Sequence, residues 1–568
     1  MISLTAFAGE IPKLLPRLLP DGFGQIARNC KLVNGGIMPY RQPADFRVIA
    51  PGNVMFFKRG TTWFEWSKVV DVAPAPIAAN RLYVTGDGAP KIVVDSLTIL
   101  PLAVPRPAAK LLLTTSGTPD AATQATVLYT YTYVTSYDEE SEPAPLSDEI
   151  LRSPGMNISI TNFVAPPTNR AINRIRIYRS QTSASGTTEL YFIAELPLPT
   201  PTTYIDNPEA SPIQEPIPSL YFNPPPDDLQ GIIALPNGMM AAFAGKKLYF
   251  SEPWKPHAWP EKYVLTTNFD IVGLGAFGQS IAVMTTGNPY VVTGVAPDAM
   301  VMERLEVNFP CLTKRGIVDL GYSVAYPAPD GLVTISAAGA QLVSRKLISR
   351  DDWLTMDPAS FVASQYEGRY MAAYSFTDRM GAPQVGTLII DLTGEQPFIS
   401  RLNDHADYMF YEIGEGKLFM LKGGVVTEFD ALSRPFMSLT WRSKQFVHPG
   451  HVNYGALLVE AEDVSNLGDP NAAAKIDISD ASVVNATFPT TDSGAAGGFT
   501  SQAGFEATVY ADGRAVRTII RPNVVERLPG GFQARVWEIE FRGGLQISSA
   551  VLAWSPSEMA MMGQGGVP

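Results

Sequence analysis

The pattern of apolar and polar positions predicts short β-strands separated by turns along almost the whole chain. Between residues 221 and 435, strand-like apolar runs recur around Leu248, Tyr290, Leu332, Leu388 and Val425. The first two intervals are 42 residues each, the third is 56 and the fourth is 37. Each run follows another apolar run and a turn, so every repeat holds several strands. A repeat of about 40–45 residues with several short strands is typical of β-propeller blades.

Repetition of this kind has a physical reason, because one four-stranded sheet cannot bury both of its faces and must stack against a neighbour. The long interval contains residues 350–364, RDDWLTMDPASFVAS, which predict a short helical insertion. Hairpin-like runs in residues 53–100 are expected to supply a further blade. We therefore predict an all-β fold with a β-propeller of about six blades, the first at 53–105 and the others at 221–435.

The segment between these blades has a different texture. A proline-rich stretch at 101–107 reads as a linker, and strongly alternating aromatic and β-branched residues follow it. Several runs of strand length, spaced by polar turns, predict a small antiparallel sandwich over 106–220. Residues 129–134, 139–143 and 175–180 resemble a fibronectin type III-like module, which implies a β-sandwich inserted into the connectivity of the propeller.

Both ends of the chain lie outside the repeat. Residues 1–52 read as an irregular segment rich in proline and glycine, with a tight turn expected at Asn34-Gly35-Gly36. Residues 436–568 contain strand-like runs interrupted by a low-complexity stretch at about 464–503. We expect the two ends to pair into a platform.

Composition and charge narrow the function classes. The 568 residues include 47 glycines and 48 prolines, and only 17% are charged, which favours a turn-rich chain over one with long helices. The formal net charge of −12 lacks the surplus of Lys and Arg on which DNA affinity mainly depends. No apolar run approaches the length of a membrane helix, and the first residues do not resemble a signal peptide. Cys30 and Cys311 are expected to be buried free thiols of a protein made in a reducing cytosol.

Motifs for phosphate binding, metal binding and nucleophilic catalysis are weak. The run from Gly273 to Gly278 satisfies GxGxxG, but a strand follows it where a dinucleotide site needs a helix, so it reads as a blade turn. His448 and His451 flank a Pro-Gly loop, and the sequence offers no third metal ligand beside them. No G-x-S-x-G elbow is present.

Acidic and aromatic residues give further candidates. The cluster Asp138, Glu139, Glu140 and Glu142 is a candidate for calcium, but a solvated loop is the favoured interpretation. Paired carboxylates for glycoside cleavage could be sought among Asp330, Asp351 and Asp391. Aromatic residues could form a sugar-stacking platform, but aromatic residues in strands more often pack in the core and between blades. They include Trp63, Trp66, Trp254, Trp259, Tyr129, Tyr131 and Tyr133. We nominate no catalytic, cofactor-binding or metal-binding residue.

The layout as a whole resembles one family, the tail nozzle proteins of short-tailed bacteriophages, also called tail tubular protein B, and related packaged-DNA stabilisation proteins. The residues that carry the resemblance are 28–32, 34–39 and Arg41, then 81–88 with Pro90, then 441–444, and finally 550–554 with 557–558. They span nearly the full chain. The inserted sandwich and the 464–503 stretch are less general features of such proteins.

The resemblance implies a non-enzymatic structural virion protein that needs no cofactor. It implies a homohexameric ring in the tail, below the portal and head-to-tail adaptor, with tail fibres, spikes or a needle attached. If the paired chain ends form the ring contacts, deleting residues 1–50 is expected to abolish ring assembly and to leave the propeller folded. Double-stranded DNA would pass through without sequence-specific binding, after assembly in the host bacterial cytoplasm. Two alternatives stay open: a carbohydrate-binding or glycoside-cleaving propeller, and a spike or adhesin subunit without a conduit.

Overall fold

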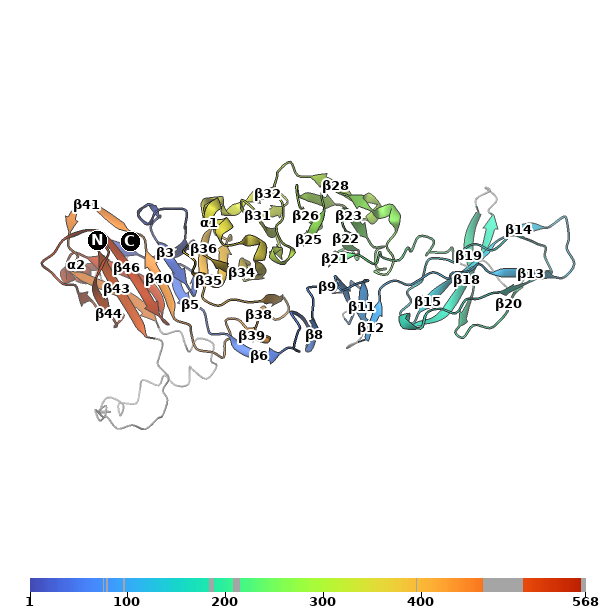
Figure 1. The fold of residues 1–568 in the computed structure, drawn as a ribbon, viewed down its shortest axis with the longest axis horizontal. Coiled ribbons are helices and arrows are strands. Elements are labelled where there is room, and N and C mark those ends of the chain that lie inside the picture. The colour runs from blue at the N-terminus through green and yellow to red at the C-terminus, as the bar shows by residue number, and fades with distance from the viewer. Residues whose placement is uncertain are drawn as a thin grey trace, which may run out of the picture. The chain divides into compact units, whose positions relative to one another are not determined.

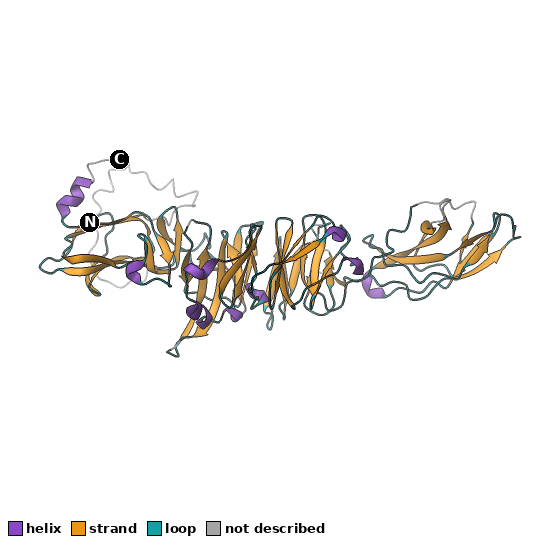
Figure 2. Cartoon of the chain, turned by 90° about the horizontal axis from the view of Figure 1, so that it is seen from above, coloured by secondary structure: helices purple, strands orange, loops and turns teal. Residues whose placement is uncertain are grey.

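The chain is almost entirely β-structure, arranged in two compact units. The computed structural model describes residues 1–74, 76–77, 80–94, 98–182, 188–207, 215–378, 380–394, 396–462 and 504–562. One unit combines Met1–Phe56 with Leu312–Pro568, and the other is Phe57–Cys311. Strands make up most of the regular structure in both units, with two short α-helices among the described residues (Figure 1, Figure 2). The all-β class predicted from the sequence is therefore confirmed.

The unit Phe57–Cys311 contains three four-stranded antiparallel sheets in which neighbouring strands follow one another along the chain. Sheet 1 is β9 (Asp71–Pro74), β10 (Leu82–Thr85), β11 (Lys91–Val94) and β12 (Thr98–Pro101). Sheet 2 is β21 (Gln230–Ala234), β22 (Met240–Ala244), β23 (Lys247–Phe250) and β24 (Leu265–Thr266). Sheet 3 is β25 (Ile271–Phe277), β26 (Ser280–Thr285), β27 (Tyr290–Thr293) and β28 (Val301–Arg304).

These three sheets share apolar cores with their neighbours. Tyr83 and Ile92 of sheet 1 and Met240 of sheet 2 belong to one cluster of buried side chains. Phe243 of sheet 2 and Val283 of sheet 3 belong to another. Sheet 2 thus buries one face against sheet 1 and the other against sheet 3, which a single four-stranded sheet cannot do alone.

Two further three-stranded sheets enclose a core of their own between sheets 1 and 2 in the sequence. One is β13 (Leu112–Ser116), β17 (Asn157–Thr161) and β20 (Tyr204–Asp206). The other is β15 (Tyr129–Thr135), β18 (Ile172–Thr182) and β19 (Thr188–Pro197). A small sheet of β14 (Ala125–Val127) and β16 (Ile150–Arg152) lies beside them. Tyr129, Ile158 and Ile175 meet in the shared core, so the two larger sheets pack as layers.

The other unit contains three more sheets built on the same plan. Sheet 4 is β29 (Val318–Asp319), β30 (Val324–Ala328), β31 (Gly331–Ser336) and β32 (Gly339–Leu342). Sheet 5 is β33 (Val362–Tyr366), β34 (Arg369–Thr377), β35 (Pro383–Asp391) and β36 (Phe398–Leu402). Sheet 6 is β37 (Tyr408–Glu412), β38 (Lys417–Lys422), β39 (Val425–Glu428) and, from the N-terminal segment, β6 (Ala44–Val48).

The predicted helical insertion is confirmed. Helix α1 (Arg350–Thr355) lies between sheets 4 and 5, and the Ser349 side chain accepts a hydrogen bond from the Asp352 N–H at its N-terminus. Trp353 is fully buried in the core that sheets 4 and 5 share, and its indole N–H donates to the Ala328 carbonyl at 2.8 Å. The insertion explains the 56-residue interval, because it lengthens the connection and leaves the sheet plan unchanged.

The remaining strands form two large sheets in which the two ends of the chain mix. Sheet 5 continues through β2 (Ala8–Glu10), β3 (Phe23–Arg28), β40 (Leu439–Ser443), β46 (Ala534–Gly543), β43 (Phe505–Ala511) and β44 (Arg514–Ile519), with β41 (Phe446–Val452) also paired to β46. The second large sheet holds β4 (Cys30–Val33), β5 (Gly36–Pro39), β47 (Gln546–Ala553), β42 (Ala456–Glu462), β45 (Glu526–Arg527) and β1 (Ile2–Leu4). Helix α2 (Pro556–Met562) follows β47.

The structure corrects part of the sequence interpretation. Residues 1–50 are not irregular, because they contain six strands. The segment rich in proline that lacks strands is the loop at 11–20. The turn at Asn34 and Gly35 is confirmed, with φ values of 54° and 80°. The hairpin of β7 (Met55–Arg59) and β8 (Thr62–Trp66) is a separate two-stranded sheet and not part of sheet 1. The low-complexity stretch at about 464–503 lies outside the described residues.

Candidate functional site

The interleaved strands of the two chain ends, which we call the terminal platform, are the first candidate site. Strand β3 pairs with β40, so that Ala27 lies opposite Trp441. Strand β1 pairs with β47, with Ile2 opposite Leu552, and β5 also meets β47. Figure 1 shows β3, β40, β46 and β43 as successive strands of one sheet. Neither end can form this platform alone, because each sheet takes strands from both.

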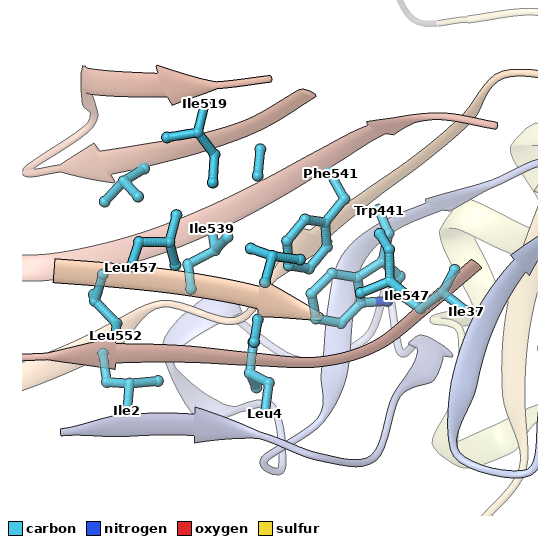
Figure 3. Packing of buried hydrophobic residues seen from close by; sticks show 14 of the residues in the cluster. Ile2, Leu4, Ile37, Trp441, Leu457, Ile519, Ile539, Phe541, Ile547 and Leu552 are labelled. Carbon is cyan, nitrogen blue, oxygen red and sulfur yellow. The ribbon is translucent and has the colours of Figure 1, made fainter. Parts of the chain in front are cut away.

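A single apolar core fills the space between the two platform sheets (Figure 3). The Trp441 ring stacks on Phe541 with ring centroids 5.7 Å apart, and Phe7 meets Trp441 edge-on at 5.1 Å. The indole N–H of Trp441 donates to the Ala8 carbonyl at 3.0 Å. One C-terminal side chain therefore fixes two N-terminal residues through both apolar packing and a hydrogen bond.

Buried carboxylates add polar links between the ends. Glu10 is only 6% exposed, and its two oxygens accept from the Ala27 N–H at 2.8 Å and the Arg401 guanidinium at 3.0 Å. Glu538 accepts from Arg442 at 2.7 Å and from the Gln25 amide at 2.9 Å. Because a buried carboxylate is costly unless it is fully paired, these contacts select the observed strand order over others.

Lys31 ties the β4–β5 hairpin to sheets 5 and 6. Its ammonium group pairs with Glu367 and with Asp430, the latter at 3.3 Å. It also lies 5.9 Å from the ring centre of Tyr40 and 5.7 Å from that of Tyr366. Two anions and two aromatic faces hold one cation, which gives this lysine a positioning role.

A proline-stiffened loop leaves the platform with exposed leucines. In residues 11–20, Leu15 and Leu18 are 56% and 60% exposed, and Leu14 is 37% exposed. A groove of about 460 Å³ lies beside it, lined by Ile11, Lys13, Leu14, Lys346, Leu347, Gln396 and Pro397. Exposed apolar side chains on a rigid loop are typical of a contact surface for another protein.

The acidic cluster is buried, contrary to the solvated loop expected from the sequence. Glu139 and Glu140 are 4% and 3% exposed. Arg170, which is fully buried, donates to Glu139 at 2.6 Å and to the carbonyls of Leu102 and Ala103 at 3.2 and 3.3 Å. The charges join the layered sheets to the chain that leaves sheet 1. The sequence indicated a solvated loop because the arginine partner of Glu139 lies 31 residues away and is not apparent from the local pattern.

Glu140 extends this joint toward the 252–259 loop. One of its oxygens accepts from Thr132 at 2.9 Å, Tyr178 at 2.6 Å and Ser219 at 2.9 Å. The Nε2 atom of His257 lies 3.0 Å from the Glu140 carbonyl, and burial lowers the pKa of His257 to about 4. The described contacts of Glu139 and Glu140 therefore stabilise the fold. The exposed acid of the cluster, Asp138, pairs with Arg174.

The glycine run and the other histidines do not assemble a site. The segment from Gly273 to Gly278 forms strand β25 and the turn into β26, as the sequence predicted. His448 and His451 both lie on strand β41, and the His448 ring forms a hydrogen bond of 3.0 Å with the Tyr454 hydroxyl. Within the part of the chain that the structure describes, no three His, Cys, Asp or Glu side chains gather as a metal would require.

The three aspartates considered for glycoside cleavage have separate surroundings. Asp330 pairs with Arg350 at 2.7 Å, and both side chains are exposed. Asp391 pairs with Arg369 at 2.6 Å and also accepts from Thr393, contacts that lower its pKa against the opposing effect of burial. Asp351 lies in the first turn of α1. Arginine ion pairs thus engage two of the three carboxylates, Asp330 and Asp391, which gives them structural partners.

The aromatic candidates divide into core and surface. Tyr129, Tyr131 and Tyr133 are at most 2% exposed and form the centre of the layered sheets. Trp259 is 1% exposed, whereas Trp254 on the same loop is 53% exposed. Trp66 stacks on Phe64 with ring centroids 6.3 Å apart, and Trp63 lies with it on the β8 strand. Only the structure separates the exposed tryptophan from its buried neighbour.

Both cysteines are buried and free, as the sequence predicted. The Cys30 thiol donates to the Arg28 carbonyl at 3.1 Å, and burial raises its pKa well above the ordinary range. A thiol that stays protonated is a poor nucleophile and a poor metal ligand, so Cys30 acts as a small apolar core residue.

No family model and no curated protein matches the sequence. Among solved structures, the N-terminal domain of Nup159 aligns with a TM-score of 0.24 and 9% identity over 47% of this chain and 67% of that one. An exo-β-1,3-galactanase from Phanerochaete chrysosporium aligns with a TM-score of 0.22 and 11% identity over 67% of this chain and 93% of that one. PorZ from Porphyromonas gingivalis aligns with a TM-score of 0.21 and 11% identity over 65% of this chain and 43% of that one. In the described part of the chain, none of the helices has the length and apolar character that crossing a bilayer needs.

Proposed function

We propose that this chain is the subunit of a phage tail nozzle, a structural virion protein that forms a hexameric ring and continues the DNA channel below the portal and adaptor. The observation that carries the proposal is the terminal platform, in which strands from both chain ends pair within two shared sheets. A platform of this kind holds the exposed leucine loop rigidly, which suits a surface that must repeat the same contact around a ring.

Six sets of four neighbouring strands, sheets 1 to 6, support a propeller of six blades as the body of the subunit, and sheet 5 continues from its set into the platform. Sheets 1 to 3 stack in one unit and sheets 4 to 6 in the other, each burying its faces against the next. Strand β6 completes sheet 6 by pairing with β39, with Val48 opposite Val425 and Ala44 opposite Glu428, although the two strands lie near opposite ends of the repeat in the sequence. A strand from before the first sheet that completes the last one would tie the repeat into a ring.

The charge balance suits passage of DNA better than retention by phosphate contacts. With a net charge of −12, the subunit lacks the cationic surplus that would neutralise phosphates and slow a sliding duplex. Retention of the packaged genome is then mechanical and depends on loops. The fibronectin III-like layered sheets are proposed to point away from the conduit, toward attached fibres or spikes.

Imaging and mass measurement test the proposal directly. Virion images should place the chain on the tail axis, and a hexamer of 61.5-kDa chains has a mass of about 369 kDa, six times the chain mass, by mass photometry. Substituting Leu15→Ser and Leu18→Ser should abolish the hexamer while the melting temperature stays unchanged. A matched control, Leu112→Ser, removes a leucine of 51% exposure from the other unit and should leave assembly intact.

The outcomes distinguish the alternatives. A trimer would favour a spike or adhesin, and a monomer that cleaves a polysaccharide would favour a glycoside-cleaving propeller. Location away from the tail axis would overturn the nozzle assignment. Deletion of residues 1–50 is not a suitable test, contrary to the expectation from sequence, because it removes β3 from a large sheet and β6 from sheet 6.

A further inference from the structure

An exposed tryptophan occupies a backbone position that suits glycine. Glu252 and Lys255 pair across a tight turn, and the Lys255 N–H donates to the Glu252 carbonyl at 3.1 Å. Pro253 fixes a negative φ at the first central position, and Trp254 follows with φ of 62°. This is a type II turn, whose second central residue is normally glycine or asparagine. A tryptophan there carries conformational strain that glycine, which has no Cβ, would avoid.

The indole is held flat by a glycine on the neighbouring hairpin. The backbone N–H of Trp254 donates to the Gly238 carbonyl at 2.8 Å, which brings the turn against that hairpin. A Cβ placed on Gly238 would come within 2.5 Å of two indole carbons, so one face of the ring lies directly on the glycine backbone. The side chain is nevertheless 53% exposed, which leaves its other face to solvent. A rigid ring with one supported face and one open face is a platform for stacking.

The residues beside Trp254 and Gly238 are mainly polar. Asn237, next to Gly238, has a half-buried side chain whose amide donates to the Val295 carbonyl at 3.1 Å. Lys255 follows Trp254 on the same turn and is exposed, and Val295 adds one exposed apolar side chain. By contrast, Trp259 turns inward, where its indole N–H donates to the Pro256 carbonyl at 2.8 Å. One loop therefore buries one tryptophan and presents another.

We propose that Trp254 is the stacking platform of a glycan-binding site, which takes a pyranose ring on its open face and prefers acidic sugars. The C–H face of a pyranose is flat and apolar and matches a single open indole face, whereas its hydroxyl rim needs polar partners such as the Asn237 amide. The Lys255 ammonium favours a sugar that carries a carboxylate or phosphate. A protein hot spot would be surrounded by a broader apolar area than one valine provides. The site lies within Phe57–Cys311 and does not depend on the nozzle assignment.

The test uses the full-length protein on an array of neutral and acidic oligosaccharides, followed by calorimetric titration of the oligosaccharides that bind. Trp254→Gly and Trp254→Asn should lower affinity by at least about tenfold, and Trp254→Phe should retain it within about threefold. Lys255→Gln should weaken binding of acidic sugars and leave neutral ones unchanged. Tyr322→Ala, which removes another aromatic side chain of 55% exposure, is the matched control and should bind as the unchanged protein does.

Stability separates a ligand platform from a structural tryptophan. Glycine suits the turn, so Trp254→Gly should melt within about 2 °C of the unchanged protein or above it. A clear fall in the melting temperature would show that the ring is there for packing and would overturn the proposal. The same holds if no oligosaccharide binds, or if binding survives in Trp254→Gly. Assembly of the hexamer is measured separately and reports only on the nozzle assignment.

Discussion

Replacing Arg170 by methionine should destabilise the unit Phe57–Cys311 more than any surface substitution. The Arg170 and Glu139 side chains are 1% and 5% exposed and lie 2.6 Å apart. Methionine fills the volume of the arginine stem but leaves Glu139 buried without its counter-charge and removes the donors to Leu102 and Ala103. Breaking a buried ion pair on one side costs about 3–5 kcal/mol in the free energy of unfolding. For a unit of this size, we expect the melting temperature to fall by roughly 10 °C.

A double-mutant cycle shows whether the uncompensated charge is the cause. Glu139→Gln combined with Arg170→Met makes both partners neutral and should recover about 2 kcal/mol or more of the loss. The assay is calorimetric unfolding of the single and double variants, with hydrogen exchange of the β15 amides as the local reporter. The chain offers a matched control in the exposed pair of Lys110 and Asp148, which lie 2.7 Å apart with side chains 44% and 81% exposed.

Lys110→Met should change the free energy of unfolding by less than about 0.5 kcal/mol, because water screens an exposed pair and its ordering costs entropy. The reasoning is refuted if Arg170→Met is as mild as Lys110→Met. It is refuted equally if the double variant is no more stable than Arg170→Met alone, since the loss would then come from packing and not from charge.

Three further predictions concern pH, the platform core and its surface. Burial lowers the pKa of His257 to about 4, whereas the unfolded side chain titrates near 6.5. The contribution of His257 to the free energy of unfolding is therefore complete above pH 6.5 and falls by about 3 kcal/mol as the pH drops to 4. His257→Gln should flatten that part of the stability curve measured by urea titration. Calorimetry should show a cost of about 3–5 kcal/mol for Trp441→Ala in the unit that contains the platform. Trp441→Phe should cost less, because both variants lose the indole hydrogen bond to Ala8 but phenylalanine keeps an aromatic ring against Phe541. Leu15→Ser and Leu18→Ser should each change stability by less than about 0.5 kcal/mol, and a larger loss in thermal melts would mean that these leucines pack within the subunit and are unsuited to assembly.

The sequence by itself determined the strands and their repeat. The apolar runs around Leu248, Tyr290, Leu332, Leu388 and Val425 lie on or at the start of β23, β27, β31, β35 and β39, each the third strand of its sheet. Turn residues and local alternation are sufficient for this, because a strand with a buried face and a two-residue hairpin turn depend on immediate neighbours in the chain. The helical insertion was predictable for the same reason.

Only the tertiary structure decided which distant strands pair and which polar groups are buried. The register of β3 with β40 and of β6 with β39 depends on sheet edges that must find partners, and no local pattern records where those partners lie. Glu139 resembled a solvated acid until Arg170 was placed beside it. Trp254 and Trp259, five residues apart, have similar sequence surroundings, and only the turn geometry and the neighbouring hairpin turn one outward and the other into the core. Local sequence encodes backbone conformation, whereas burial is a property of the whole packed chain.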